Sequence, residues 1–194
     1  MKVTFTPSHL SGTISAPPSK SMAHRMLICG GLSHGNISTI QGISDSDDVT
    51  ATLRCLEALG ASYEKHGTTV TVKGMDIRKS NPKKALDCYE SGSTLRFFLP
   101  LCLLSGHQAT LIGTKKLFSR PLSVYENICK EQNLIYQQKE NSVSVRGKIS
   151  AGEYKIPGNI SSQFITGLLF ALPLCEKDSI LHIIPPLKAV LIWI

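Results

Sequence analysis

The feature that most constrains the fold of this chain is an internal repeat. In three places, small hydroxyl residues stand beside a basic or amide side chain and precede a long apolar run. These stretches are 19–25, 91–96 and 161–164, and their first serines are separated by 72 and then 70 residues. A fixed period of this kind predicts one supersecondary unit used three times. Each unit would direct the positive end of a helix, together with its hydroxyls, toward an anion.

The predicted elements follow the same repeat. Apolar residues at helical spacing predict helices over 20–32, 45–60, 91–104, 121–131 and 161–172. Short β-rich runs predict one or two strands in 1–14, and further strands over 37–40, 62–63, 68–72, 86–88, 109–112, 135–137, 142–145, 153–156 and 179–184. This alternation predicts an α/β domain built from βαβαββ units, in which the third unit lacks its second helix and closing strands.

Composition narrows the class of protein. The longest apolar runs are too short to span a bilayer, and the first residues lack the apolar core of a signal peptide, so we expect a cytoplasmic protein. Six scattered cysteines without a Cys-x-x-Cys pair predict buried, reduced thiols. The net charge of +7 fits nucleic acid, an acidic membrane surface or small anionic substrates. With only 6% aromatic residues and no basic block, recognition of single-stranded nucleic acid is poorly supported.

The acidic run 45–48 has two interpretations. Its carboxylates can complement the positive end of the following helix, which is the simpler explanation. A metal site is the alternative, but the glycine and the distal glutamate of a calcium loop are missing. We therefore expect no metal at this run.

The basic helix starts carry the candidate site. In the first, Lys20, Ser21 and Arg25 with free backbone amides could bind a phosphate or carboxylate, or could simply form a capped, solvated helix start. In the second, Gly92 would let backbone amides approach an anion, with Arg96 one turn later. Arg120 stands before a helix expected to start at Pro121 and could clamp an oxyanion. The same two interpretations apply to the polar start of the third helix, Ser161, Ser162 and Gln163.

Taken together, residues 16–25, 45–49, 90–96, 119–121 and 161–164 resemble the EPSP synthase family, over nearly the whole chain to about Pro185. The sister family, UDP-N-acetylglucosamine enolpyruvyl transferase, is a weaker match because it usually has Lys-Asn where this chain has Lys20-Ser21. The resemblance implies one half of an inside-out α/β barrel enzyme. That enzyme transfers the enolpyruvyl group of phosphoenolpyruvate to the 5-hydroxyl of shikimate 3-phosphate, in the pathway to chorismate and the aromatic amino acids. It implies no cofactor, no nucleic-acid or membrane partner, and a monomer.

The resemblance also assigns roles. Lys20 would contact both substrates and is the one catalytic residue expected in this chain. Ser21, Arg25, Ser161, Ser162 and Gln163 would hold shikimate 3-phosphate, with Gln163 also near phosphoenolpyruvate. Gly92 and Arg120 would bind phosphoenolpyruvate, and Arg96 matches a family arginine at that site. The acid and base carboxylates would lie in a second half that this chain lacks, so we expect the chain alone to be inactive.

Three regions are therefore expected: a strand segment 1–14 that would pack on the second half, a substrate-binding domain 15–185, and an aberrant tail 186–194. In the tail, the resemblance implies a Glu-Ser-Arg segment after a leucine, where this chain continues as Leu-Lys-Ala-Val-Leu-Ile-Trp-Ile. Deleting one G from suitable codons produces this change, which suggests a frameshift or a sequencing error. The alternatives are a non-enzymatic module that binds phosphoanions or nucleic acid, and a translation product without function.

Overall fold

The computed structural model describes residues 2–9 and 11–186. The tail 187–194, with its suggested frameshift, lies outside the described residues. The first unit contains α1 (Lys20–Leu32), β1 (Ile37–Ile40), α2 (Asp47–Leu59), β2 (Ser62–His66) and β3 (Thr69–Lys73). The second contains β4 (Leu86–Asp87), α3 (Gly92–Cys102), β5 (Ala109–Ile112), α4 (Lys115–Phe118), α5 (Ser123–Glu131), β6 (Ile135–Gln138) and β7 (Ser142–Arg146). The third contains β8 (Glu153–Pro157), α6 (Ser162–Ala171) and β9 (Ile180–Ile184).

The sheets confirm the internal repeat. The first sheet has the strand order β1-β3-β2, with both pairs antiparallel. The second has the order β4-β5-β7-β6, in which β5-β7-β6 repeats the antiparallel arrangement of the first sheet. The parallel pair β4–β5 is in turn matched by the parallel pair β8–β9. The first and second units thus share the antiparallel three-stranded part, and the second and third units share the parallel pair.

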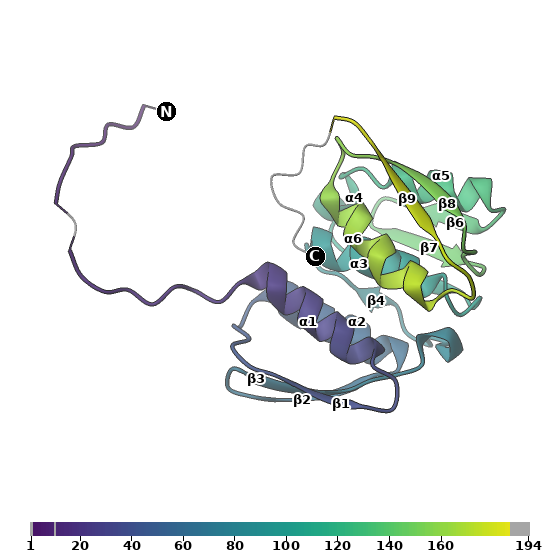
Figure 1. Ribbon diagram of the computed structural model, residues 1–194, viewed down its shortest axis with the longest axis horizontal. Helices are drawn as coiled ribbons and strands as arrows, with labels where there is room; N and C mark the ends of the chain where they lie inside the picture. The colour runs from purple at the N-terminus through teal and green to yellow at the C-terminus, as the bar shows by residue number, and fades with distance from the viewer. Residues whose placement is uncertain (1, 10, 187–194) are drawn as a thin grey trace.

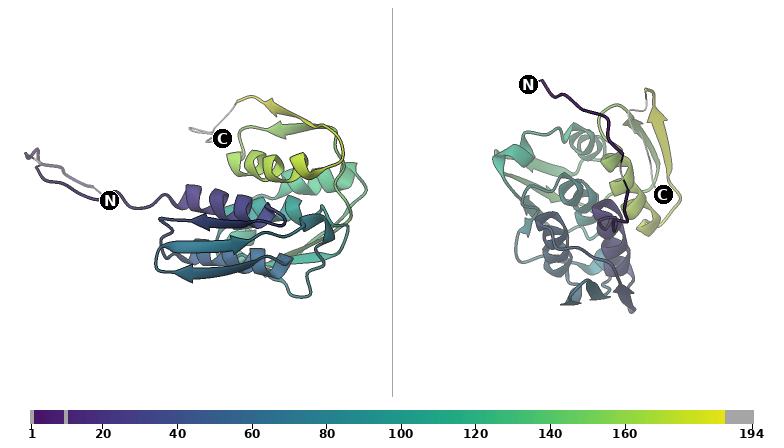
Figure 2. Two further views of the ribbon diagram at one scale, coloured as in Figure 1. Left: turned by 60° about the horizontal axis from the view of Figure 1, so that its bottom comes forward. Right: turned by 90° about the vertical axis from the view of Figure 1, so that its left-hand side faces the viewer.

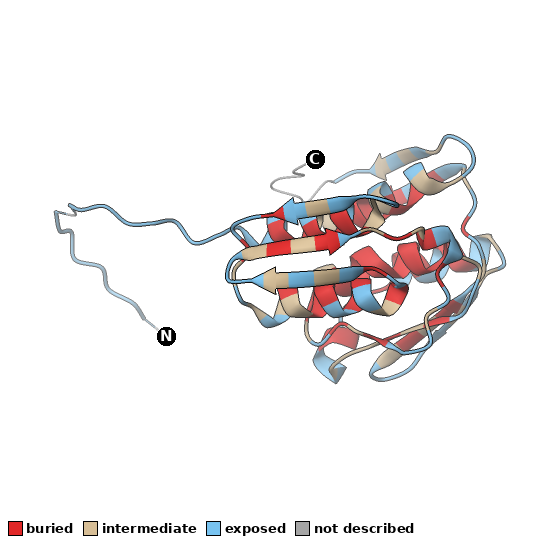
Figure 3. Cartoon of the chain, turned by 90° about the horizontal axis from the view of Figure 1, so that it is seen from below, coloured by how far each residue is buried: buried red, intermediate tan, exposed pale blue. Residues whose placement is uncertain are grey.

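Helices occupy the interior of the domain and sheets cover it. Viewed along their axes, α1, α3 and α6 lie at the centre of the molecule, and the three sheets lie around them (Figure 2, right). The first sheet covers α1 and α2 from below (Figure 1), and its central strand β3 is its most buried strand (Figure 3). The contact between α3 and α6 is the core of the molecule, because both helices are apolar on almost every side, as expected for buried helices.

Local chemistry explains why the three central helices begin where they do. Ser19, Ser91 and Ser161 are the N-cap residues of α1, α3 and α6, and each hydroxyl accepts a hydrogen bond from a backbone N–H of the first turn. Ser46 caps α2 in the same way, with Asp47 and Asp48 in its first turn. The acidic run 45–48 therefore serves as a helix start. In the described residues, no cluster of three or more potential ligands for a metal ion is present.

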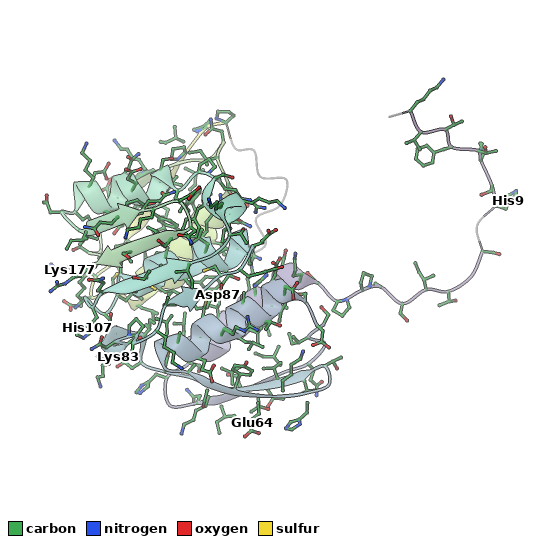
Figure 4. The ribbon with its side chains drawn as sticks, turned by 180° about the vertical axis from the view of Figure 1, so that it is seen from behind. His9, Glu64, Lys83, Asp87, His107 and Lys177 are labelled. Atoms are coloured by element: carbon green, nitrogen blue, oxygen red, sulfur yellow. The ribbon has the colours of Figure 1, made fainter. Side chains whose placement is uncertain are left out.

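Several sequence predictions were wrong in detail. Residues 2–9 and 11–19 form no strand; they extend away from the domain (Figure 1), and His9 lies far from it (Figure 4). An extended segment becomes a strand only where another strand offers hydrogen bonds, and none of the described strands pairs with it. The helix expected from Pro121 begins at Ser123, because the short helix α4 and a turn precede it.

The predicted state of the cysteines is confirmed in part. All six are free thiols, but Cys29 is exposed on α1 and Cys175 is half-buried. In the described part of the chain, no helix is long and apolar enough to cross a membrane.

Candidate functional site

The starts of α1, α3 and α6 lie on the same side of the molecule, the side from which the N-terminal segment leaves (Figure 1). Side chains link these starts across the repeats. Arg25 of α1 donates to the hydroxyl of Thr166 on α6 at 3.4 Å, and Gln163 of α6 donates to the hydroxyl of Ser93 on α3 at 2.9 Å. The three motifs that the sequence analysis singled out are therefore brought together at one face.

Two guanidinium groups converge beside Gly92. A Cβ atom at Gly92 would stand 2.9 Å from Nη1 of Arg120, 3.1 Å from Nη1 of Arg96 and 3.6 Å from Oε1 of Gln163. A side chain at this position would press on the ends of Arg120 and Arg96, which a glycine leaves free to approach the backbone. The backbone of Gly92, two arginines and an amide thus face one small volume at the positive end of α3.

Arg96 is held rigidly. Its guanidinium donates to Oε1 of Gln163 at 2.7 Å and to the carbonyl oxygen of Pro121 at 3.2 Å, and it lies 5.1 Å from the ring centre of Phe164. Arg96 is only 7% exposed. Burial lowers the pKa of its guanidinium, and the nearby charge of Arg120 lowers it further, although Tyr125 opposes this. A buried cation with another cation beside it favours binding of an anion.

Arg120 supplies the exposed half of the pair. It follows α4, whose first turn is capped by Thr114, and the backbone N–H of Thr114 donates to the carbonyl oxygen of Tyr89 at 3.0 Å. Among the described residues, no hydrogen bond or ion pair of the Arg120 side chain is found. Its charge is therefore available to a ligand.

The segment that leads into α3 is strained. Tyr89 has a φ of 52°, a left-handed backbone conformation that is rare for an aromatic residue. Its N–H donates to Oδ1 of Asp87 at 2.9 Å, which holds the turn. Strain of this kind is found where the surroundings force a particular geometry, and here it lies three residues before Gly92.

The basic residues of α1 are engaged differently from expectation. The ammonium of Lys20 forms an ion pair with Asp48 at 2.6 Å, because the start of α2 lies beside the start of α1. Arg25 donates to the carbonyl oxygen of Ser21 at 2.9 Å, and its guanidinium lies 5.6 Å from the ring centre of Phe97. Burial lowers the pKa of Arg25. Ser21 itself is exposed.

The structure also shows polar residues that the sequence analysis did not select. His24, Thr52 and Thr94 are almost fully buried and hydrogen-bonded to one another between α1, α2 and α3. Ser93 and Thr166 complete the contacts of Gln163 and Arg25. A signal was present for Thr52, because it stands at helical spacing between Val49 and Leu56 on the buried face of α2. His24 gave no such signal, because it lies within the basic motif 20–25, whose basic residues were expected to be exposed.

Comparison with known proteins identifies the family. The family model for EPSP synthase (3-phosphoshikimate 1-carboxyvinyltransferase) matches residues 5–189. The chain belongs to the EPSP synthase family. The match extends slightly beyond the limit near Pro185 that was drawn from the sequence.

Curated relatives agree with the EPSP synthase assignment. The 3-phosphoshikimate 1-carboxyvinyltransferase of Clostridium perfringens is 44% identical over 180 residues, covering 92% of this chain and 42% of that protein. The protein of the same name from Clostridioides difficile is 45% identical over 184 residues, covering 89% of this chain and 42% of its own length. The chain thus spans about 42% of the length of these relatives.

Solved structures support the fold. EPSP synthase from Acinetobacter baumannii matches with a TM-score of 0.77 at 22% identity, over 92% of this chain and 41% of that chain. The enolpyruvyl transferase NikO from Streptomyces tendae matches with a TM-score of 0.52 at 10% identity, over 84% of this chain and 38% of that chain. The predicted α/β fold, as a partial domain of the EPSP synthase type, is therefore confirmed.

Proposed function

We propose that this chain supplies a substrate-binding half of an enzyme that transfers the enolpyruvyl group of phosphoenolpyruvate to the 5-hydroxyl of shikimate 3-phosphate. The observation that carries this proposal is the convergence of Arg96, Arg120 and Gln163 on Gly92. Two cations that approach one glycine need an anion between them, and both proposed substrates are anions. Family membership then indicates which anions these are.

Phosphoenolpyruvate is proposed to bind at Gly92. Arg120 would pair with the negative groups of phosphoenolpyruvate, and the buried charge of Arg96 would stabilise the same anion from the protein interior. Neutralising this anion lets a second anion approach it, which electrostatic repulsion would otherwise oppose. In the reaction, the 5-hydroxyl gives up its proton to a base as its oxygen bonds to C2, and C3 gains a proton from an acid. The bond from C2 to the phosphate oxygen then breaks, C3 releases a proton, and inorganic phosphate leaves.

Shikimate 3-phosphate is proposed to bind across α1 and α6. Ser161 and Ser162 begin α6, where free backbone amides and hydroxyls suit a phosphate group. Arg25 already reaches α6 through Thr166, so its charge lies between the two helices. Lys20 would exchange its exposed ion pair with Asp48 for the substrates, at small cost because exposed ion pairs contribute little. The carboxylates that move protons are proposed to lie in the part of the enzyme that this chain does not include.

Replacing Arg120 with alanine tests the phosphoenolpyruvate site. We expect the Arg120→Ala variant to bind phosphoenolpyruvate about tenfold or more weakly, because hydrogen bonds to charged groups contribute about 1.5–3 kcal/mol. Isothermal titration calorimetry with saturating shikimate 3-phosphate measures this. Arg25→Ala should instead weaken binding of shikimate 3-phosphate.

Arg146→Ala is the matched control, because Arg146 is an exposed arginine at the end of β7. It should leave both affinities within about twofold of the parent chain. Equal losses in Arg120→Ala and Arg146→Ala would contradict the proposal. Tight binding of an oligonucleotide that weakens steeply with salt would favour a nucleic-acid module instead.

We propose a cytoplasmic location, a monomeric full-length enzyme, and no nucleic-acid or membrane partner. Six free thiols support a reducing compartment, since disulfides form in oxidising ones.

A further inference from the structure

Four buried polar side chains form a chain of hydrogen bonds between three helices. His24 of α1 contacts Thr52 of α2 through Nδ1 and Oγ1 at 2.7 Å. The hydroxyl of Thr52 lies 2.9 Å from that of Thr94 on α3, and Thr94 donates to Oγ of Ser91 at 2.7 Å. All four residues are at most 1% exposed. We call these four residues the hydroxyl relay.

The direction of the hydroxyl relay follows from its first member. Nε2 of His24 is buried, and among the described residues it has no hydrogen-bond partner. A buried N–H without an acceptor is rarer than a buried acceptor without a donor, so the ring proton belongs on Nδ1. His24 then donates to Thr52, Thr52 donates to Thr94, and Thr94 donates to Ser91. The ring proton of His24 and the hydroxyl protons of Thr52 and Thr94 are then all used.

The hydroxyl relay ends at the residue that starts α3. Oγ of Ser91 also accepts from the backbone N–H of Thr94 at 3.2 Å and so caps the helix. Gly92 and Ser93, which follow the cap, are the residues that face Arg120 and Gln163. The first member stands between Lys20 and Arg25 on α1. The relay therefore joins the basic start of the first unit to the glycine start of the second.

We propose that His24 is a positioning residue that, through Thr52 and Thr94, fixes Gly92 and Ser93 relative to Lys20 and Arg25. The position of α3 against α1 matters for a ligand that touches both helices. In the proposed function, this ligand is phosphoenolpyruvate, whereas shikimate 3-phosphate spans α1 and α6. The expectation that phosphoenolpyruvate is affected more than shikimate 3-phosphate rests on the proposed function. The expected effect on the start of α3 does not.

Substitutions of Thr52 test the hydroxyl relay, because they change one hydroxyl without touching the site. Thr52→Val removes the hydroxyl at nearly constant volume, and Thr52→Ser keeps it. Thr110→Val is the matched control, since Thr110 and Ser144 form a similar hydroxyl pair at 2.9 Å between β5 and β7. Backbone amide signals and hydrogen exchange of the ¹⁵N-labelled chain are measured first, and the ligand affinities are measured next.

For Thr52→Val, we expect the amide signals of Gly92 and Ser93 to shift and the Thr94 amide to exchange about tenfold faster. Binding of phosphoenolpyruvate should weaken about tenfold, and binding of shikimate 3-phosphate by less than about threefold. Thr52→Ser should match the parent chain in each measurement. The ring nitrogens of His24 in the parent chain should show a proton on Nδ1 and none on Nε2.

The inference is overturned if Thr52→Val changes the Gly92 and Ser93 signals no more than Thr110→Val does. It is also overturned if the parent His24 carries its proton on Nε2. If Thr52→Val does not fold, the ring nitrogens and Thr52→Ser decide. If the parent chain binds neither ligand, the proposed function fails, while the amide and ring signals still decide the positioning role.

Discussion

At the scale of single residues, the site depends on what is absent as much as on what is present. Gly92 matters because it has no side chain, which leaves room for Arg96 and Arg120 to approach its backbone. His24 matters because it lacks a charge. Gly92 was a candidate from its sequence context, whereas His24 could be read from the sequence as an ordinary helix residue and is given a role only by its neighbours.

Adding one methyl group at Gly92 should separate binding from folding. In Gly92→Ala, the Cβ atom would press on the ends of Arg120 and Arg96. The tip of Arg120 can move away, so we expect stability to fall by less than about 1 kcal/mol while affinity for phosphoenolpyruvate falls about tenfold or more. Calorimetry and urea unfolding measure the two effects. An unchanged affinity in Gly92→Ala would rule out this geometry.

His24 should make the stability of the fold depend on pH. Burial lowers its pKa from 6.5 to about 4; the charges of Lys20 and Arg25 lower it too, and that of Asp48 opposes them. Between these values the unfolded chain binds a proton that the folded chain does not, so stability is lost as pH falls from about 6.5 to about 4. The loss contributed by His24 should reach about 3 kcal/mol. Urea unfolding at pH 7 and pH 4.5 should show a smaller pH-dependent loss in His24→Gln; an equal loss would contradict this role.

At the scale of elements, helix starts were predicted well and the segments between them less well. Hydroxyl-rich starts followed by apolar spacing located α1, α3 and α6, and the acidic run located α2, each to within about two residues. The sequence did not predict α4, because four residues are too few for a periodic pattern. Arg120 and Gly92 were both expected at one ligand site, and the guanidinium of Arg120 does lie beside Gly92, but Arg120 follows α4 and does not directly precede a helix at Pro121. Strands in 1–14 were overpredicted, since β-propensity cannot show whether a partner strand is present.

The crossing of α3 and α6 should tolerate no added volume. A Cβ atom at Gly167 would collide with the hydroxyl of Tyr125 and with the carbonyl oxygen of Arg96. That carbonyl accepts a hydrogen bond from Tyr125 at 2.6 Å, so the backbone has little freedom to move. We expect Gly167→Ala to destabilise the fold by about 1–3 kcal/mol or more.

Leu169→Ala on the same helix is the comparison, because Leu169 is 42% exposed. Its effect should stay near 0.5 kcal/mol, as is about usual for surface positions. Thermal unfolding of both variants gives the difference. Similar midpoints for the two would mean that the helices can separate at no cost.

At the scale of the whole molecule, the repeat predicted the architecture and the shared face of the three helix starts. What the sequence could not provide is the contacts between repeats, such as Arg25 with Thr166 or Gln163 with Ser93. These pairs are 141 and 70 residues apart in the chain. Each forms only because the units pack around common helices, and spacing within one unit does not encode such contacts.

The third sheet should be the first part of the domain to open. It has two described strands, and in β9 the exposed residues include Ile180 and Ile184. The first sheet has three strands, and Val70 and Val72 of β3 are fully buried. Two-stranded sheets are marginally stable, so native-state hydrogen exchange should give lower opening free energies for β8 and β9 than for β3. Equal protection of these strands would show that the domain opens only as a whole.

The left-handed backbone at Tyr89 has a consequence for engineering and for evolution. A glycine there would relieve the strain and should make the protein more robust, yet it would also loosen the turn that aligns Gly92 with the segment carrying Arg120. Selection for stability would thus favour glycine at this position, whereas selection for ligand binding would favour tyrosine. Variants selected only for thermal stability would therefore gain stability from glycine at this position and lose affinity for the ligand.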